Sequence, residues 1–211
     1  DVLVAVVVVV RGRRSPAVGK ALAETAGRDK MPISGMAGLD TAQLHIKPFY
    51  LTDIIGLPVN MPVVFLKWFR GQFKEPRKPR IGLIYADAPY AKAVADELPK
   101  WTQKLDIELL PPVAGPVNMT DASVEIQNVM KGNPDFVWIH YVAGPTAVVM
   151  KDTVRLGVKD KTQWGTFGFG GYDPAVFQTV AAGAADGIYT SLLHALVTET
   201  DKPGIKLATD I

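Results

Sequence analysis

Short apolar runs alternate with longer stretches of helical periodicity along most of the chain. The clearest unit begins with the apolar residues 81–85, which predict a buried strand, and continues through a polar elbow at residues 86–88 into a helix. Pro89 suits the first position of that helix, because its missing N–H would have no partner there. Ala91, Val94 and Leu98 then recur at helical spacing and form one apolar face.

The same strand–elbow–helix unit repeats toward the end of the chain. Strands are predicted at residues 2–10, 31–34, 107–111, 136–139, 164–167 and 187–190, and helices at 16–26, 62–72, 89–104 and from about residues 120, 144 and 173. The helix at 62–72 carries apolar residues on more than one face, which predicts burial on two sides. Strands that alternate with helices predict a parallel sheet, whose carboxyl ends meet at one edge. Open sheets of this class bind ligands at that edge.

Composition narrows the class of protein. The chain has 211 residues, and 23 basic against 21 acidic residues give a net charge of +2, which does not favour nucleic-acid binding. It has no cysteine, which excludes disulfides, thiolate catalysis and cysteine-type metal sites. The longest apolar run, residues 2–10, is half of the roughly 20 residues that a membrane helix needs. The basic, proline-broken run at 74–80 is interpreted as a solvated linker rather than a phosphate-binding patch, and it marks the best domain boundary.

Residues that could perform catalysis are sparse. The three histidines show no metal-ligand spacing, and the chain has no phosphate-binding loop, dinucleotide fingerprint or nucleophile elbow. His140 directly follows a predicted strand and is interpreted as a hydrogen-bonded structural residue. We therefore expect no catalytic residue, no metal and no cofactor, and the chain is not expected to be an enzyme.

The predicted elbows are better suited to binding. Ser15 precedes a helix, where it either contributes to an anion site or only caps the helix, and residues 34–38 form either a backbone-lined binding loop or an ordinary tight turn. Aromatic residues gather just past strand ends, and together they favour a wall for an organic ligand, although each one alone could simply pack in its own domain. These residues are Tyr90, Tyr141, Phe169 and Tyr172.

Four segments carry a resemblance to a known family. They read IGLIYADAPYAKAVADEL (81–98), TDASVEIQNVMKGNPDFVWIH (120–140), GPTAVVMKDTVRLG (144–157) and GYDPAVFQTVAAGAADGIYTS (171–191). In this order and spacing the chain resembles type I periplasmic binding proteins, most closely the leucine/isoleucine/valine- and amide-binding kind that serves ABC importers. The resemblance covers most of residues 79–192 and is weaker over 15–75, where MPISGMAG (31–38) stands in place of the family's strand and elbow.

The resemblance implies an α/β fold of two Rossmann-like parallel-sheet lobes joined by a hinge. Residues 1–77 would be part of the N-terminal lobe, 78–193 the C-terminal lobe, and 194–211 a return segment to the N-terminal lobe. Because the family's opening units have no counterpart here, we expect the chain to be a fragment with an incomplete first lobe.

The resemblance also implies a ligand site in the cleft between the lobes. The positions that match the family's first-lobe site are Ser15, Ser34, Met36, Ala37 and Gly38, and those that match its second-lobe site are Tyr90, Tyr141 or Val142, Phe169 and Gly170. Gly38 lacks the hydroxyl that the family often has there, and Gly170 lacks the acidic group with which amino-acid binders meet the ammonium. The basic turn at residues 11–14 also departs from the family's small-residue turn.

By this resemblance the chain is expected to be the solute-binding component of an ABC importer. It would clamp a small polar organic ligand, namely a branched-chain amino acid, an amide or a related carboxylate. Its partner would be a membrane permease, and its location periplasmic or extracellular and lipid-anchored, without nucleic-acid binding or membrane insertion of its own. Two alternatives are the ligand-sensing domain of a signalling receptor and a Rossmann-type enzyme, for which the glycine fingerprint is missing.

Overall fold

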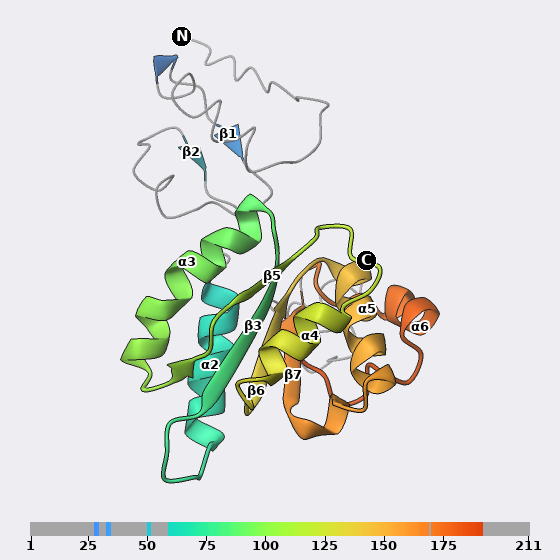
Figure 1. Cartoon of the computed structure of the whole chain (residues 1–211). Helices are drawn as coiled ribbons and strands as arrows, with labels where there is room; N and C mark the ends of the chain where they lie inside the picture. Colours follow the sequence, from blue (N-terminus) through green and yellow to red (C-terminus); the bar gives the residue numbers. More distant parts are fainter. Residues whose placement is uncertain (1–27, 30–32, 35–49, 52–58, 169, 192–211) are drawn as a thin grey trace, which may run out of the picture.

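A six-stranded parallel sheet forms the centre of the structure, a computed structural model that describes residues 28–29, 33–34, 50–51, 59–168 and 170–191 (Figure 1). The strands are β3 (Arg80–Ala86), β4 (Glu108–Leu109), β5 (Val113–Gly115), β6 (Phe136–His140), β7 (Gln163–Phe167) and β8 (Tyr189–Ser191). They follow the order β4-β3-β6-β7-β8, and β5 also pairs with β3. The predicted parallel α/β sheet is therefore confirmed. A separate parallel pair joins β1 (Ile33–Ser34) to β2 (Tyr50–Leu51).

One predicted strand is shorter than expected, and an unpredicted strand follows it. Of the segment at 107–111 only β4 forms a strand, which pairs with the start of β3, whereas β5 lies beyond the predicted range and pairs with the end of β3. Pro111 and Pro112 separate them, because a proline has no N–H to donate to the sheet. The predictions at residues 2–10 and 16–26 lie outside the described residues.

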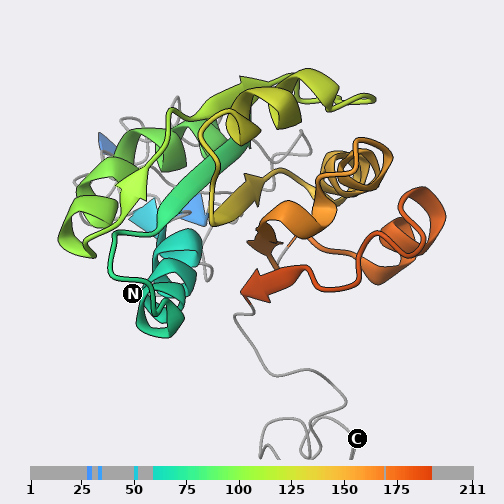
Figure 2. The same ribbon diagram turned by 60° about the horizontal axis from the view of Figure 1, so that its bottom comes forward.

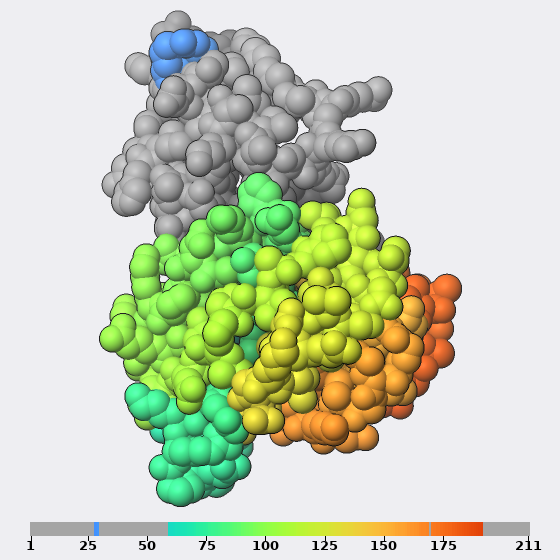
Figure 3. All heavy atoms as spheres, viewed as in Figure 1, coloured from blue at the N-terminus to red at the C-terminus, as the bar shows by residue number. Residues whose placement is uncertain are grey.

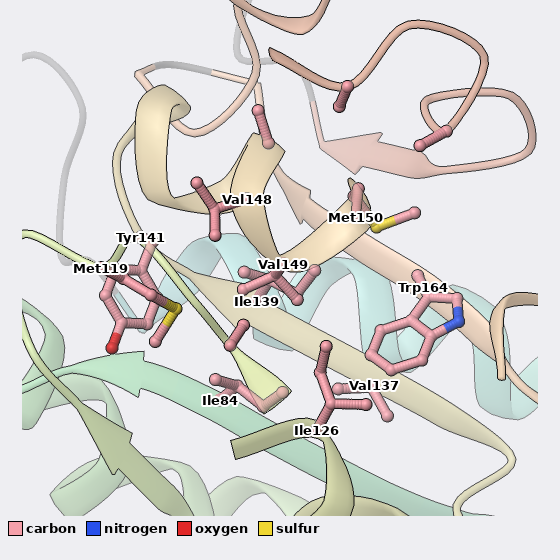
Figure 4. Close-up of a cluster of buried hydrophobic side chains, with 14 of the residues drawn as sticks. Ile84, Met119, Ile126, Val137, Ile139, Tyr141, Val148, Val149, Met150 and Trp164 are labelled. Carbon is pink, nitrogen blue, oxygen red and sulfur yellow. The ribbon is translucent and has the colours of Figure 1, made fainter. Parts of the chain in front are cut away.

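Side chains alternate between the two faces of β6 and thereby define two apolar layers. Phe136 and Trp138 pack on the side of α2 (Asn60–Gln72) and α3 (Pro89–Lys104). Val137 and Ile139 pack on the other side, against α4 (Ser123–Met130) and α5 (Ala143–Arg155) (Figure 4). The helix α6 (Pro174–Val180) packs beside α5 on this second side, at the far end from α2 (Figure 2). The short 3₁₀ helix η2 (Lys159–Lys161) precedes β7. Burial on both faces explains why the central strands are almost entirely apolar.

The helix α2 packs on this sheet, although it precedes the predicted domain boundary. The ring of Phe65 lies 4.6 Å from that of Phe136 and 5.6 Å from that of Trp138. The prediction that this helix is buried on two sides is wrong, because the side chains of Val64 and Trp68 are 67% and 47% exposed. Since α2 covers the same sheet as α3, we propose that this lobe begins near residue 59 rather than at residue 78.

The segment that follows α2 projects from the surface (Figure 3). Residues 74–78 are exposed, in agreement with the interpretation as a solvated linker. Arg77 nevertheless binds Asp135 through two hydrogen bonds of 2.7 Å, and Asp135 also accepts the backbone N–H of Arg80 at 2.7 Å. These bonds fix the start of β3 beside the start of β6.

Candidate functional site

The loops after β3, β6 and β7 meet at the carboxyl edge of the sheet. The strands are parallel and in register there, with Ile84 opposite Ile139 and Ile139 opposite Thr166. The loop after β3 enters α3 at Pro89, and the loop after β6 enters α5 at Ala143. Among the predicted second-lobe residues, the backbone brings Tyr90, Val142 and Gly170 to this edge.

Tyr90 lies in the first turn of α3 and leans over the end of β6. Its side chain is half-buried, and its ring centroid is 5.9 Å from that of His140. The hydroxyl oxygen is buried and makes no hydrogen bond of standard geometry in the described part of the chain, although the backbone N–H of Val142 lies near it. Burial raises the pKa of the phenol, and the backbone N–H of Val142 acts in the opposite direction. The Tyr90 hydroxyl therefore lies near the backbone N–H of Val142, which brings the start of α3 close to the loop after β6.

Tyr141 and Val142, the two alternatives after β6, have opposite environments. Tyr141 continues the alternation of β6 and is 0% exposed within the apolar layer, whereas Val142 is 47% exposed. The hydroxyl of Thr146 lies 2.9 Å from the carbonyl oxygen of Tyr141 and 3.0 Å from that of Val142, so its proton is shared between them. This contact fixes the loop and leaves Val142 at the surface of the edge.

His140 is enclosed by aromatic rings. Its Nδ1 accepts a hydrogen bond of 3.2 Å from the indole N–H of Trp138, and the Phe167 ring centroid lies 4.6 Å from that of the imidazole. The imidazole is 1% exposed, and burial lowers its pKa to about 3. It is therefore neutral at physiological pH, in agreement with the interpretation of His140 as a hydrogen-bonded structural residue.

The loop between β7 and α6 approaches the strands closely. The backbone N–H of Gly168 donates to the carbonyl of Ser191 at 2.7 Å, and Gly170 is exposed with φ +82°. A Cβ at Gly171 would lie 2.6 Å from the carbonyl oxygen of Phe167, so only glycine fits there without a shift. Asp173 caps α6 by accepting the N–H groups of Ala175 and Val176.

The remaining predicted positions are described only in part. Ser34 is the last residue of β1 and pairs with Leu51. Ser15, Met36, Ala37, Gly38 and Phe169 lie outside the described residues, so the predicted first-lobe wall stays a prediction.

Two surface hollows lie away from this edge. One of about 280 Å³ lies beside α6 and is lined by Tyr172 and Phe177, and one of about 980 Å³ lies at the amino edge of the sheet between Trp68, Phe73 and Tyr189. The hollow beside α6 includes Tyr172, one of the aromatic residues expected to line a ligand site, but neither hollow contains a residue matched to the family's site.

Two acidic residues at the edge were not singled out in the sequence. Asp87 follows β3, and its backbone N–H donates to the carbonyl of Gly115 at the end of β5. Glu125 lies in the first turn of α4, beside Gly115. The signals that could have marked them are a carboxylate in the elbow after a predicted strand and another in the first turn of a predicted helix.

The described residues show neither a metal site nor a membrane-spanning helix. No group of three or more His, Asp or Glu side chains there is arranged to hold a metal ion. None of the described helices is both long and apolar enough to cross a bilayer.

The comparisons with known proteins point to one family. A sequence model of the family described as periplasmic binding protein matches residues 5–206. No curated protein matches the chain.

Three solved structures illustrate the structural likeness. A branched chain amino acid ABC transporter protein from Thermus thermophilus with bound valine has a TM-score of 0.73 at 18% identity, and covers 92% of this chain and 49% of its own. A fatty acid ABC transporter substrate-binding protein from Thermomonospora curvata has a TM-score of 0.73 at 17% identity, with coverages of 91% and 48%. An extracellular ligand-binding receptor from Rhodopseudomonas palustris HaA2 has a TM-score of 0.67 at 15% identity, with coverages of 90% and 53%. The chain thus spans about half the length of these proteins.

Proposed function

The chain belongs to the periplasmic binding protein family, and we propose that it serves as the solute-binding component of an ABC importer. The observation that carries the proposal is the family match over residues 5–206 together with the parallel sheet whose loops after β3, β6 and β7 meet at one edge. The solved proteins with this fold cited above are transport-associated binding proteins or receptors. Binding and release, with no covalent step, is the corresponding activity.

The proposed site at this edge combines polar and apolar groups. Tyr90 offers a buried hydroxyl that makes no hydrogen bond of standard geometry in the described part of the chain. Val142 stands before the first turn of α5, which has no side-chain cap. Free N–H groups at a helix start favour a carboxylate or another anion. With Gly170 and Phe169 on the adjacent loop, and with Ser15, Ser34, Met36, Ala37 and Gly38 as the proposed opposite wall, the cleft would hold a small organic molecule with a polar head.

The proposed ligand class is a branched-chain amino acid, an amide or a related carboxylate. The Thermus thermophilus structure holds valine, and the Thermomonospora curvata protein is named for fatty acids. Both ligands join a carboxylate to an apolar chain, which suits a cleft of hydroxyl, backbone N–H and aromatic groups.

The proposal includes a partner and a location. The bound ligand would be handed to a membrane permease, and the protein would act in the periplasm or, lipid-anchored, outside the cell. Closure on the ligand would be a hinge motion driven by tighter binding to the closed state.

A second candidate is the ligand-sensing domain of a signalling receptor. The Rhodopseudomonas palustris protein is described as an extracellular ligand-binding receptor, and it has the same fold. Both candidates require reversible ligand binding. They differ in whether the liganded protein stimulates a permease's ATPase or engages a signalling partner.

Thermal unfolding with a ligand panel tests the binding function. The panel contains amino acids, amides, urea-like compounds and aromatic carboxylates. A ligand at 100 times its Kd stabilises the native state by about 2.7 kcal/mol, which raises Tm by a few degrees. We expect one compound class to raise Tm and the compound to be recovered unchanged.

Two variants locate the binding. Tyr90→Leu removes a ring at the carboxyl edge and should reduce the Tm shift strongly. Phe73→Leu removes a ring beside Arg77 at the opposite edge and should leave the shift intact. Conversion of the ligand to a product, or a cooperative transition that no compound moves, would contradict the proposal.

A further inference from the structure

A hydroxyl and a carboxylate converge over Gly115 at the end of β5. A Cβ added to this glycine would lie 2.7 Å from the hydroxyl oxygen of Tyr141 and 2.8 Å from Oε1 of Glu125. The third neighbour is the flexible Met119, whose Cε would be 2.7 Å away. Because glycine has no side chain, both oxygens can lie close to the position that a Cβ would occupy.

The buried hydroxyl of Tyr141 makes no hydrogen bond of standard geometry in the described part of the chain. Its residue is 0% exposed, and the backbone N–H of Gly115 lies close enough to the oxygen to act against the rise in the pKa of the phenol. Figure 4 shows the ring beside Met119 at one end of the apolar cluster, with the oxygen directed away from the other labelled side chains. Buried hydroxyls in native proteins are normally paired. An unpaired one at a binding edge therefore indicates a group that arrives from outside.

The surrounding charge is negative. Within the described ranges, neither Glu125 nor Asp87 takes part in an ion pair. Burial, followed by the charge of Glu125, raises the pKa of the Tyr141 phenol, and Asp87 acts in the same direction. The phenol therefore keeps its proton at neutral pH. With that proton turned toward Glu125, its lone pairs are free to accept an N–H.

Gly115 and Tyr141 lie next to the loops of the proposed ligand site. Gly115 pairs with Ala86, whose strand leads to Asp87, and the carbonyl of Gly115 accepts the N–H of Asp87 at 2.8 Å. Tyr141 directly precedes Val142, the exposed residue of the next loop. Gly115 and Tyr141 therefore adjoin the two loops that are proposed to contact the ligand, the loop after β3 and the loop after β6.

We propose that Tyr141 and Glu125 form a subsite for a cationic or N–H-donating group of the ligand, with Asp87 adding negative charge nearby. This inference rests on the proposed function and narrows its ligands to molecules with an ammonium, amidinium or amide N–H group. The carboxylate of Glu125 accepts one N–H and the hydroxyl of Tyr141 a second, while a small movement of Met119 admits the group.

Matched pairs of probes test this subsite on the 211-residue chain. Each pair differs in one nitrogen group: L-valine and 3-methylbutanoate, L-phenylalanine and 3-phenylpropanoate, and butyramide and 2-pentanone. Calorimetric titration should give a lower Kd for the nitrogen-bearing member of at least one pair, by about tenfold, as expected for a hydrogen bond to a charged group.

Conservative variants assign that preference to the two residues. Glu125→Gln removes only the charge and Tyr141→Phe only the hydroxyl, and each should reduce the preference to less than about threefold while the nitrogen-free member binds as before. The charge-matched control is Glu108→Gln on the exposed edge strand β4, which should keep the full preference.

The outcomes separate this inference from the proposed function. If both members of every pair bind equally well, or if the preference survives in both variants, the subsite is overturned and the binding function stands. If no probe binds the unaltered chain, the subsite is overturned, and the thermal unfolding panel alone decides the binding function.

Discussion

At the scale of single residues, the neutral state of His140 predicts a pH-dependent stability. Its pKa is about 3 in the native state because of burial, against about 6.5 when exposed. Between these values the unfolded chain binds a proton that the native chain does not. Native stability is therefore complete above pH 6.5 and falls as the pH drops toward 3, by about 2 kcal/mol at pH 5.

Urea unfolding at pH 7.5 and pH 5 checks this prediction. His140→Gln keeps an acceptor for the indole N–H of Trp138 and cannot titrate, so it should lose less stability on acidification than the unaltered chain. The difference between the two proteins removes the contributions of the other titrating groups. An identical loss in both would show that His140 is not held neutral by the fold.

Thr146 is the residue that should control the loop after β6. Thr146→Val keeps the shape but removes the hydroxyl shared by the carbonyls of Tyr141 and Val142, and should cost about 1–3 kcal/mol. Amide hydrogen exchange near Val142 should also accelerate. Denaturant unfolding and exchange measure the two effects.

The control for this prediction is Thr153→Val. Thr153 is equally buried, but its hydroxyl donates to the carbonyl of Met150 inside α5. That carbonyl lies in the helix interior, where the backbone already supplies a partner, so the cost should be smaller. If the two variants lose the same stability, the loop does not depend on Thr146.

At the scale of elements, Asp152 connects α5 to the start of α4. The carboxylate is 1% exposed and accepts the backbone N–H of Ala122 at 2.8 Å and Nε of Arg155 at 3.0 Å. Asp152→Ala leaves the Ala122 N–H buried without a partner, which should cost about 1–3 kcal/mol or more. Asp160→Ala, in the exposed helix η2, should change stability by less than about 0.5 kcal/mol. Equal unfolding midpoints for both variants would contradict this role.

The helix α2 yields a prediction about where the lobe begins. Phe65→Ala removes a ring packed on Phe136, Trp138 and Tyr189 and should cost about 3–5 kcal/mol. Val64→Ala, at a site 67% exposed on the same helix, should be nearly neutral. Chemical denaturation of the two variants makes the comparison. A small effect of Phe65→Ala would mean that α2 is not part of this lobe.

The sequence was most informative where local signals agree. Pro89 and the apolar spacing after it predicted α3 over residues 89–104, the bounds that the structure shows. The sequence was less informative where tertiary packing determines which side chains are exposed and which strands pair. The exposure of Val64 and Trp68 depends on which face of α2 meets the sheet, and the division between β4 and β5 depends on pairing with β3.

The candidate site shows the same limit. Alternation along β6 could have placed Tyr141 on the buried face of Ile139. It could not have predicted the exposure of Val142, because its second neighbour His140 is also buried and the exposure begins where the strand ends. No local pattern could have placed Glu125 beside Tyr141, since that contact joins α4 to the loop after β6 across Gly115. Long-range contacts of this kind appear only once the sheet is assembled.

At the scale of the whole molecule, the central claim is that the carboxyl edge of the sheet binds the ligand. The most direct test is backbone amide chemical-shift mapping of the isotope-labelled chain, titrated with the compound that raises Tm most. The account predicts that the shifted amides cluster at residues 86–90, 115, 141–143 and 168–171. Shifts confined to the opposite hollow around Phe73, Asp135 and Gln163, or to the hollow beside α6, would contradict it.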